Sequence, residues 1–376
     1  MCAAPHVTPV ATSRDLARFI EVPYRLYRND PNWIPPLRSD ERRQLDAKSN
    51  PAYDHSEAQL FLAWRGATPV GRIAAIISRR YIERWHRKCG RFGWFECEND
   101  PATADALYGT AEEWLRERGM EEISGPLGFT DLDPTGFLVE GFDELPTIAG
   151  SYNPPYYNDF AVAHGYAKEV EYVEFRTTVP DELPAKVARL AEVLKKRSGV
   201  RVFSERNRKT LAATWGTEVF QLLNRAYVDL YGTTELSKRQ IEFYIEGYLG
   251  HVEPEFIKLA VHGERLVGFV IAMPNLSRAF QKARGRLFPF GFIHLLRGMK
   301  TSKVLDFYVA GVSPEYRNRG IDLLMAYEMG KTALARGMTH AESNREMEEN
   351  AKIQAQWKLY DRRLHRRSWV YTKRLT

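Results

Sequence analysis

A basic, glycine-containing segment at 312–324, VSPEYRNRGIDLL, has the composition of an anion-binding turn. It follows VLDFYVAG, which predicts a strand, and it precedes an apolar helix expected over 320–336. The unpaired amides and dipole of that helix would face the turn. The side chains and glycine that favour an anion there are Arg317, Arg319 and Gly320. The segment predicts a diphosphate site, although an ordinary loop before a basic helix start has the same composition.

Asp322 opposes that interpretation, because it lies in the first turn of the expected helix. A carboxylate there repels a diphosphate unless it points outward or pairs with Arg317 or Arg319. A favourable helix-capping charge is the simpler explanation of this residue.

The chain repeats two landmarks in the same order. AWRGATPVGRIAA at 63–75 and AVHGERLVGFVIA at 260–272 each predict a β-hairpin with a glycine-bearing turn. EEWLRERGMEEI at 112–123 and KTALARGMTHAE at 331–342 each predict a helix that ends at Arg-Gly-Met before a short strand. With 376 residues, the chain is long enough for two domains. We therefore expect two copies of one α/β unit.

The second copy has the more regular pattern. Its expected elements are strand 199–203, helices 207–231 and 237–249, hairpin 256–273, strand 302–312, helix 320–336, strand 339–345, helix 349–363 and strand 368–374. The first copy follows the same plan to about residue 178, with a loop-rich insertion at 127–152. Pro180 and Pro184 bracket the expected linker, so the predicted domains are 1–180 and 185–376.

The strand, loop and helix of the second copy, followed by a strand and a helix opening at Asn350, resemble the GNAT superfamily of acyl-CoA N-acyltransferases. The chain also resembles bacterial tandem proteins of this fold in its segments GP, VEGFD, YNPPYY and PEYRNRGID. The resemblance implies an α/β fold of two tandem GNAT-like units, each a mixed, mostly antiparallel sheet flanked by helices. It implies that acyl-CoA is bound by Ala310, Gly311, Val312, Arg317, Asn318, Arg319, Gly320, Ile321 and Asn350, with a main-chain amide near 310–312 as the oxyanion donor.

Attack of an amine on a thioester needs a base and, optionally, an acid for the leaving thiolate. Glu342 and Asp306 are the carboxylates of the two expected central strands, and Glu342 is the favoured base. A structural ion pair with an arginine is an equally good explanation of a buried carboxylate. By resemblance, members of the superfamily often have a tyrosine that acts as the acid seven residues after the asparagine, where this chain has Trp357 after Asn350. Tyr360 is the next candidate acid, with water as the alternative, and His365 and His294 are weaker candidates.

The first copy lacks a loop such as 312–324, since RFGWFECENDPATADA, between Arg91 and Ala106, has acidic residues and no glycine-centred basic turn. It is therefore expected to bind no coenzyme A and to shape the acceptor pocket. SYNPPYYNDF at 151–160 presents Tyr152, Tyr156 and Tyr157 as candidate acceptor contacts. Tyr308 of the second copy is a further candidate. Packing in a core or interface is the commoner role of such tyrosines.

The segment 276–300, LSRAFQKARGRLFPFGFIHLLRGMK, mixes cations with apolar residues, and no acidic residue occurs between Glu264 and Asp306. This composition suits an anionic lipid surface, a cover over an acyl chain or an acidic carrier protein; packing on the first domain is the alternative. Nucleic acid is not expected as a partner, because no recognised nucleic-acid motif accompanies the arginines.

Composition bounds the remaining possibilities. The net charge is +6, which permits an anionic partner, and Cys2, Cys89 and Cys97 have no metal-ligand spacing. The N-terminus has no signal-peptide pattern, so the protein is expected to be cytoplasmic, with peripheral contact at the inner membrane as a further possibility. No metal is expected.

The favoured function is transfer of an acyl group from acyl-CoA, or from an acyl carrier protein, to a primary amine. The basic, apolar segment favours a long-chain acyl donor and an amino-lipid acceptor, as in a ceramide-synthase type of reaction. The alternatives are acetylation of a small amine by acetyl-CoA, an aminoacyl-tRNA-dependent transfer and a non-catalytic acyl-CoA-binding protein.

Overall fold

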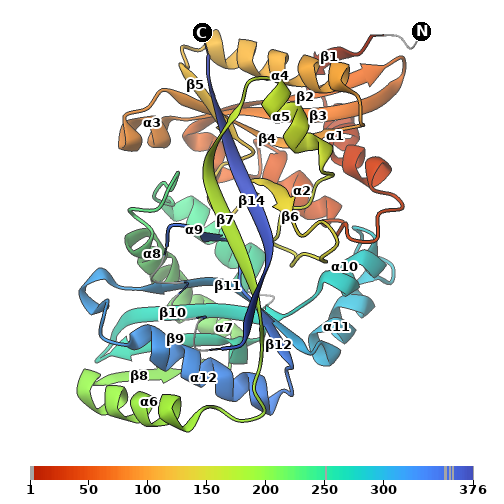
Figure 1. Cartoon of the computed structure of the whole chain (residues 1–376). Coiled ribbons are helices and arrows are strands. Elements are labelled where there is room, and N and C mark those ends of the chain that lie inside the picture. Colours follow the sequence, from red (N-terminus) through yellow and green to blue (C-terminus); the bar gives the residue numbers. More distant parts are fainter. Residues whose placement is uncertain (1–3, 250–251, 351–353, 355–356, 358–359, 376) are drawn as a thin grey trace. The chain divides into compact units, whose positions relative to one another are not determined.

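The computed structural model (Figure 1) describes residues 4–249, 252–350, 354, 357 and 360–375. The chain forms two compact units, each built from more than one segment. Unit 1 comprises Met1–Val173, Ser277–Leu295 and His365–Thr376, and unit 2 comprises Glu174–Leu276 and Leu296–Leu364. Both are α/β units, as the sequence predicts.

Unit 1 contains a mixed sheet with helices on both faces. Its strands follow the order β1-β2-β3-β4-β5-β14-β7, and β6 also pairs with β14. All pairings described for its sheet are antiparallel except that of β4 with β5. The elements are β1 His6–Pro9, α1 Ser13–Leu26, α2 Arg38–Leu45, η1 Pro51–Asp54, β2 Ser56–Arg65, β3 Thr68–Ser78, α3 Arg79–Trp85, β4 Cys89–Cys97, α4 Pro101–Arg116, β5 Glu122–Gly125, β6 Phe137–Glu140, α5 Tyr156–Ala163, the first residues of β7 Ala167–Thr178, α10 Ser277–Ala283, the start of α11 Gly291–Thr301 and most of β14 Arg362–Arg374.

The period-2 pattern of β3 explains how unit 1 buries both faces of its sheet. Ile73, Ala75 and Ile77 face a core that includes Leu107 and Leu115 of α4. The intervening residues of β3 face a second core with α1, formed from Ala74, Ile76, Phe19 and Ile20.

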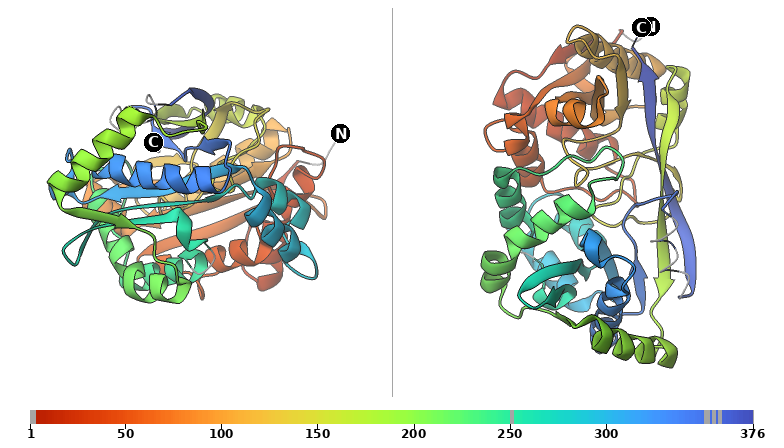
Figure 2. Two further views of the ribbon diagram at one scale, coloured as in Figure 1. Left: turned by 90° about the horizontal axis from the view of Figure 1, so that it is seen from below. Right: turned by 90° about the vertical axis from the view of Figure 1, so that its left-hand side faces the viewer.

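Unit 2 has the same plan, with the strand order β7-β12-β11-β10-β9-β8 and one parallel pairing, between β11 and β12. In the left view of Figure 2, α12 and α6 lie on one side of these strands and α8 lies on the other. The elements are the end of β7, α6 Ala185–Ser198, β8 Val200–Phe203, α7 Arg208–Thr210, the π-helical η2 Leu211–Trp215, α8 Gly216–Ala226, α9 Lys238–Tyr244, η3 Ile245–Leu249, η4 Pro254–Phe256, β9 Ile257–His262, β10 Arg265–Pro274, most of α11, β11 Val304–Val312, η5 Pro314–Tyr316, α12 Ile321–Ala335, β12 His340–Glu342 and β13 Glu346–Met347.

The two predicted hairpins have the same construction. Gly66 and Gly263 begin the two-residue turns between β2 and β3 and between β9 and β10, with φ angles of 60° and 59°. Five residues on, each hairpin has a second glycine against a helix. A β-carbon at Gly71 would lie 2.8 Å from Leu107 of α4, and one at Gly268 would lie 3.2 Å from Met325 of α12.

The two predicted helix ends match as well. Gly119 and Gly337 adopt φ angles of 76° and 61°, after α4 and α12 respectively. The following amides, of Met120 and Met338, each donate to a carbonyl five residues back, at 3.1 and 2.9 Å. Both helices therefore end in a Schellman motif, which turns the chain into the next central strand.

The units divide the chain differently from the predicted domains 1–180 and 185–376. The first boundary falls at Val173/Glu174, and the segments 277–295 and 365–376 belong to unit 1 rather than to the second half. The reason for the last segment is main-chain pairing, since Tyr371–Arg374 of β14 form a ladder with β5 and residues 367–369 pair with β6.

The predicted helix 349–363 ends too late, because β14 begins at Arg362, six residues before the predicted strand. Residues 351–353, 355–356 and 358–359 of that predicted helix lie outside the described residues. The elements predicted between 199 and 345 occur in the predicted order, whereas α6, α11 and β13 were not predicted.

Candidate active site

The central strands of unit 2 separate part-way along their length. β11 and β12 pair in parallel over three positions, from Val304 with His340 to Asp306 with Glu342. β12 ends there, whereas β11 continues to Val312, so residues 307–312 pair with no residue of β12. The Asn344 side-chain amide donates to the Tyr308 carbonyl at 2.8 Å beyond this point. The divergence begins directly after the two predicted carboxylates.

Asp306 is fully buried at this divergence. The Asn275 amide lies 3.0 Å from each of its carboxyl oxygens, and the Tyr308 hydroxyl lies 3.3 Å from Oδ2. Burial, with the nearby negative charges of Glu342 and Glu174, raises the pKa of Asp306 well above its usual range. Asp306 therefore retains a proton more readily than an exposed aspartate.

Glu342 lies beside Asp306 on the adjacent strand and is also buried, at 3% exposure. Its Oε1 lies 3.5 Å from the guanidinium of Arg176, the residue opposite it on β7. Arg176 stabilises a negative charge on Glu342 by direct Coulomb attraction. The structure thus brings the two predicted base candidates together and gives each a different partner.

The glycine turn that precedes α12 adopts a constrained conformation. Asn318 and Gly320 both have left-handed backbones, with φ angles of 62° and 75°. In anion-binding nests, left-handed residues turn neighbouring amides toward one side, so the conformations of Asn318 and Gly320 suit such a site. A β-carbon at Gly320 would lie 2.6 Å from Leu194 of α6, so glycine is required there for two reasons.

The arginines of the turn are exposed, and each has a neighbour within unit 2. Arg317 donates to the Ala226 carbonyl at the end of α8, at 2.7 Å. The Arg319 guanidinium lies 5.0 Å from the centre of the Tyr316 ring. Ile321 is buried as the first residue of α12, and Asp322 is half-buried as the second. The predicted carboxylate therefore does occupy the first turn of the helix.

The end of β11 packs closely on the neighbouring elements. A β-carbon at Gly311 would lie 2.8 Å from Phe269 of β10 and 3.3 Å from Ala226, which explains the glycine. The Ala310 carbonyl accepts from the Tyr227 hydroxyl at 3.1 Å, and Val312 packs at the edge of the α12 core.

Trp357 and Tyr360 follow the diverging strands β11 and β12 in the sequence. The Trp357 ring stands edge-on to Phe307 of β11 at 5.4 Å, and its Nε1 donates to Glu346. Burial raises the pKa of Tyr360, so it is a weaker acid than an exposed tyrosine. The Asn350 carbonyl accepts from the Gln354 amide at 3.2 Å.

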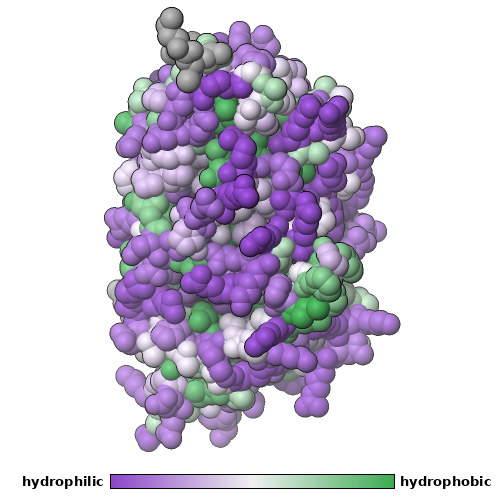
Figure 3. Space-filling view, turned by 90° about the vertical axis from the view of Figure 1, so that its right-hand side faces the viewer, coloured by the Kyte–Doolittle hydropathy of each residue, from purple (hydrophilic) through white to green (hydrophobic). Residues whose placement is uncertain are grey.

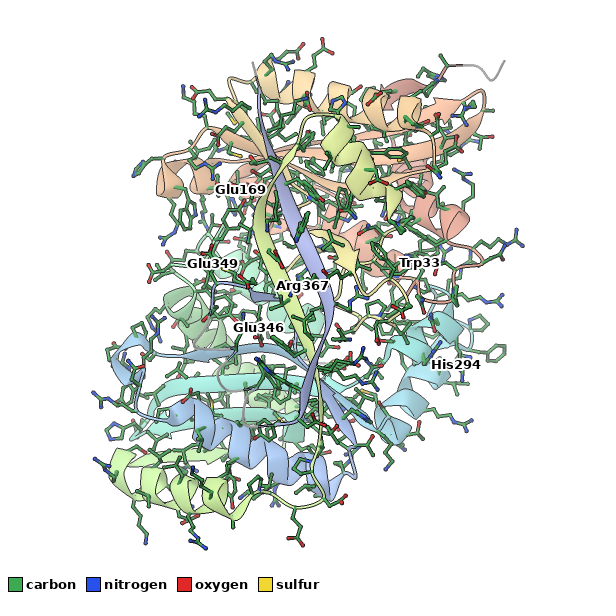
Figure 4. The ribbon with its side chains drawn as sticks, in the orientation of Figure 1. Trp33, Glu169, His294, Glu346, Glu349 and Arg367 are labelled. Atoms are coloured by element: carbon green, nitrogen blue, oxygen red, sulfur yellow. The ribbon has the colours of Figure 1, made fainter. Side chains whose placement is uncertain are left out.

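Glu346 is a titratable group that the sequence analysis missed (Figure 4). Burial raises its pKa to about 7, against the opposing effect of the hydrogen bond from Trp357. Its Oε2 is buried and forms no hydrogen bond to the residues that the structure describes. A general acid or base works best with a pKa near the operating pH, so Glu346 is a candidate proton carrier.

Three other residues around the carboxylate pair also lay outside the predictions. Glu174, Asn275 and Arg176 come from β7 and from the residue after β10, far from β11 and β12 in sequence. The only available signal was the pattern of polar residues in strands that are otherwise apolar, which does not say which strands are neighbours.

The three tyrosines of unit 1 are engaged in its packing. Tyr157 is 1% exposed, and its hydroxyl contacts Glu96 at 2.8 Å and the amide of Cys97 at 2.8 Å. The Tyr156 hydroxyl donates to the Cys97 carbonyl at 3.0 Å, and that of Tyr152 donates to Asp30 at 2.8 Å. These placements favour the packing role that the sequence left open.

The two histidine candidates lie elsewhere, in unit 1. His365 is buried with Nδ1 3.9 Å from Glu144, and His294 lies on α11. Within the described ranges, no three His, Cys, Asp or Glu side chains are placed to hold a metal ion. None of the described helices is both long enough and apolar enough to cross a bilayer.

Solved structures share this architecture. A tandem GNAT protein from the clavulanic acid biosynthesis pathway aligns with a TM-score of 0.55 at 13% identity, covering 99% of both chains. A GCN5-related N-acetyltransferase from Sphaerobacter thermophilus aligns with a TM-score of 0.51 at 13% identity, covering 99% of this chain and 96% of that one. The tandem GNAT fold that the sequence predicted is confirmed.

Sequence comparison gives the family, although no family model matches the chain. The bacterial ceramide synthase of Caulobacter vibrioides (strain NA1000 / CB15N) is 34% identical over 313 residues, covering 79% of this chain and 78% of that protein. Protein YghO of Escherichia coli (strain K12) is 30% identical over 306 residues, covering 81% and 77%. The chain therefore belongs to the family of the bacterial ceramide synthase and is an acyltransferase with the tandem GNAT fold.

Proposed function

We propose that this enzyme transfers a long-chain acyl group from acyl-CoA to the primary amine of a long-chain amino lipid. The observation that carries the proposal is the 34% identity to a bacterial ceramide synthase, together with a buried carboxylate pair at the divergence of β11 and β12. The relative's name supplies the substrate class. The residues of unit 2 supply the chemistry.

The donor's diphosphate would lie at the turn before α12. The left-handed Asn318 and Gly320 expose main-chain amides there, and Arg317 and Arg319 add positive charge. The pantetheine arm would then follow β11 toward the carboxylate pair, past Ala310, Gly311 and Val312. One main-chain amide of this stretch would stabilise the oxyanion.

Glu342 would accept a proton from the ammonium group, which then attacks as the neutral amine. Its carboxylate is stabilised by Arg176, whereas Asp306 is biased toward its protonated form by burial and by its negative neighbours. Two adjacent carboxyl groups that share one proton divide the roles of acid and base in this way. Tyr308, hydrogen-bonded to Asp306, would fix that group's orientation.

The chemical step is a substitution at the thioester carbonyl. Glu342 first removes one proton from the ammonium group, the neutral amine nitrogen then forms a bond to the carbonyl carbon, and the carbon–sulfur bond breaks to release a thiolate while the nitrogen loses its second proton to water. Glu346, with a pKa of about 7, or Tyr360 would return a proton to the sulfur. No covalent enzyme intermediate is needed.

The test is a matrix of donors and acceptors with the purified full chain. Acetyl-, octanoyl- and palmitoyl-CoA, and a palmitoyl acyl carrier protein, are each offered with a long-chain amino alcohol and with a small amine. Amide formation is followed by mass spectrometry. Palmitoyl transfer to the long-chain amine is the expected best reaction.

Other outcomes redirect the assignment. Preferred acetylation of a small amine would replace the lipid substrate class, and transfer only from the carrier protein would replace the donor. Release of amino acid from charged tRNA, with no thioester reaction, would favour an aminoacyl transferase. Thioester binding without turnover would indicate a non-catalytic protein.

A further inference from the structure

A group of large apolar side chains is exposed on α11 and the loop before it. Phe288 is 78% exposed, Phe290 69% and Leu296 59%, with Ile293 at 49% and Phe292 at 39%. We call these five residues the apolar tip. Figure 3 shows a hydrophobic area bordered by hydrophilic residues on this side of the molecule. Exposed apolar clusters of this kind mark interaction sites on natural proteins.

The backbone beneath the apolar tip is well defined. The amide of Phe292 donates to the Leu287 carbonyl at 2.8 Å, and that of Ile293 donates to the Phe290 carbonyl at 3.1 Å. Gly291 permits this tight turn, since a β-carbon there would overlap the Arg286 carbonyl oxygen at 1.8 Å. The rings of Phe288 and Phe292 lie 5.9 Å apart. The tip is therefore presented by an ordered turn and helix.

The base of the segment is held within unit 1. The Ser277 hydroxyl donates to the Pro146 carbonyl at 2.7 Å, and the Gln281 amide donates to the Pro31 carbonyl at 2.7 Å. Arg38 donates through its side chain to the Arg284 carbonyl at 2.7 Å. Packing on unit 1, the alternative considered from sequence, thus accounts for α10 and leaves the apolar tip exposed.

Cations surround the apolar tip. An open hollow of about 640 Å³ beside it is lined by Arg278, Gln281, Lys282, Arg284 and His294, the last labelled in Figure 4. Arg286, Arg297 and Lys300 are also exposed nearby in the chain. Throughout the part of the chain that the structure describes, none of these cations forms an ion pair with a carboxylate. Their charge is available to a partner.

We propose that the apolar tip and its cations dock the enzyme on the surface of an anionic lipid bilayer. The phenylalanines and aliphatic side chains would enter the boundary between headgroups and acyl chains. The cations of the hollow would meet lipid phosphates, and a segment without acidic residues adds no repulsion. This docking surface lies outside the residues assigned to acyl transfer, so it does not depend on the proposed function.

A bilayer fits this surface better than an acidic carrier protein does. On α11 the exposed apolar residues Phe292, Ile293 and Leu296 lie within one or two turns of Arg297 and Lys300. Such a helix, apolar and cationic with no acidic residue, is typical of segments that lie in the plane of a membrane interface. An acidic carrier would match the cations and leave Phe288 and Phe290 without an apolar environment.

The test is co-sedimentation of the full chain with vesicles, which needs no turnover. Vesicles of phosphatidylcholine alone are compared with vesicles of equal parts phosphatidylcholine and phosphatidylglycerol. We expect binding to the anionic vesicles that falls on the order of tenfold with Phe288→Ser/Phe290→Ser, and by a similar factor with Arg278→Gln/Lys282→Gln. The matched controls are Val162→Ser/Val193→Ser, at two exposed valines, and Lys195→Gln/Lys196→Gln on α6, which should bind as the parent does.

A second measurement reports insertion directly and does not depend on the stability of the double variants. In Phe288→Trp, vesicles with brominated acyl chains should quench fluorescence beyond the level of the parent chain. Absence of sedimentation with anionic vesicles, equal losses in the control variants, or no added quenching would each overturn the proposal. So would capture of an acidic acyl carrier protein through Arg278 and Lys282 without any vesicle binding.

Discussion

The starts of α4 and α12 occupy equivalent positions in the two units and serve different ends. α4 begins directly after Asp100, whose carboxylate accepts from the Thr103 amide at 3.0 Å, with Pro101 at its first position. α12 begins after a longer turn at Gly320, with no side-chain cap and with Arg317 and Arg319 exposed. The first helix start is capped by the Asp100 carboxylate, whereas the second has no side-chain cap and carries Asp322 as its second residue beside the two exposed arginines.

The central strands differ in the same way. The third pair of the parallel ladder is Arg91 with Ser124 in unit 1 and Asp306 with Glu342 in unit 2. In each unit the second member of this pair lies five residues after the glycine of the Schellman motif. Arg91 donates to the Gly128 carbonyl at 3.0 Å, so the position serves local structure in unit 1. One architecture thus carries a structural pair in one copy and a carboxylate pair in the other.

The largest expected effect separates these two pairs. Glu342→Gln keeps the shape of the side chain and removes its basicity, so turnover should fall by about 10²- to 10⁴-fold with little change in donor affinity. Steady-state kinetics with a donor-binding titration measures both quantities. The matched variant Ser124→Ala should lower the melting temperature and leave turnover within about twofold. Equal turnover in Glu342→Gln and the parent would remove Glu342 as the base.

The second prediction concerns Glu346. Folded Glu346 keeps its proton up to about pH 7, whereas an ordinary glutamate loses it near pH 4.5. The folded state therefore binds more protons between these values, and the stability from this group is greatest below pH 4.5 and is lost as pH rises through 7. Glu346→Gln stays neutral at every pH. The stability of this variant relative to the parent should therefore increase from pH 5 to pH 8, by up to about 3 kcal/mol in unfolding free energy, and thermal unfolding at each pH measures it.

Unit 1 offers a control for that measurement. Burial raises the pKa of Asp133 to about 6, and its Oδ2 accepts from the Thr130 amide at 2.9 Å. Asp133→Asn should alter the pH dependence of stability without changing the pH profile of kcat. A shift of the kcat profile in Glu346→Gln alone would support a role in proton transfer, and an unchanged profile would leave Glu346 a structural group.

The repeated features were accessible from sequence because they depend on local backbone chemistry. Gly66, Gly263, Gly119 and Gly337 all adopt the left-handed conformation that their turns and helix ends require. The carboxylates Asp306 and Glu342 were accessible for a related reason, since a charged residue in an apolar strand is conspicuous.

The long-range pairings were not accessible in this way. The pattern of β14 predicts a strand and says nothing about which sheet edge accepts it, so its place beside β5 could not be read from residues 362–374. The contact between Asn275 and Asp306 likewise depends on the register of β10 with β11. The roles of Tyr156 and Tyr157 depended on burial, which the turn chemistry of 151–160 does not determine.

A third prediction tests the conformational requirement at the start of α12. Gly320→Ala adds a β-carbon at φ 75° and 2.6 Å from Leu194, so it should destabilise the protein by about 1–2 kcal/mol and weaken donor binding. Thermal unfolding and a titration with palmitoyl-CoA measure the two effects. Gly66→Ala, at φ 60° with no atom within 4 Å, is the matched control. It shares the backbone strain and should leave donor affinity unchanged; equal loss of affinity in both variants would contradict a specific role for the turn.

The smallest expected effect returns to the two helix starts. Asp322 is a half-buried negative charge in the first turn of α12, where it stabilises the helix dipole and opposes a bound diphosphate. Asp322→Asn should lower the unfolding free energy by about 0.3–1 kcal/mol and tighten the binding of palmitoyl-CoA a few-fold, with the gain reduced at high salt. Calorimetric titration at two salt concentrations measures it.

Asp100→Asn makes the same change at the start of α4 and should affect stability alone. If Asp322→Asn also leaves donor affinity unchanged at low salt, the Asp322 carboxylate is directed away from the diphosphate, and the two helix starts differ through the turn at 313–320 rather than through their acidic residues. If Asp322→Asn instead weakens donor binding, the Asp322 carboxylate orders Arg317 or Arg319 for the ligand. Its direct repulsion of the diphosphate is then outweighed by the arginines that it positions.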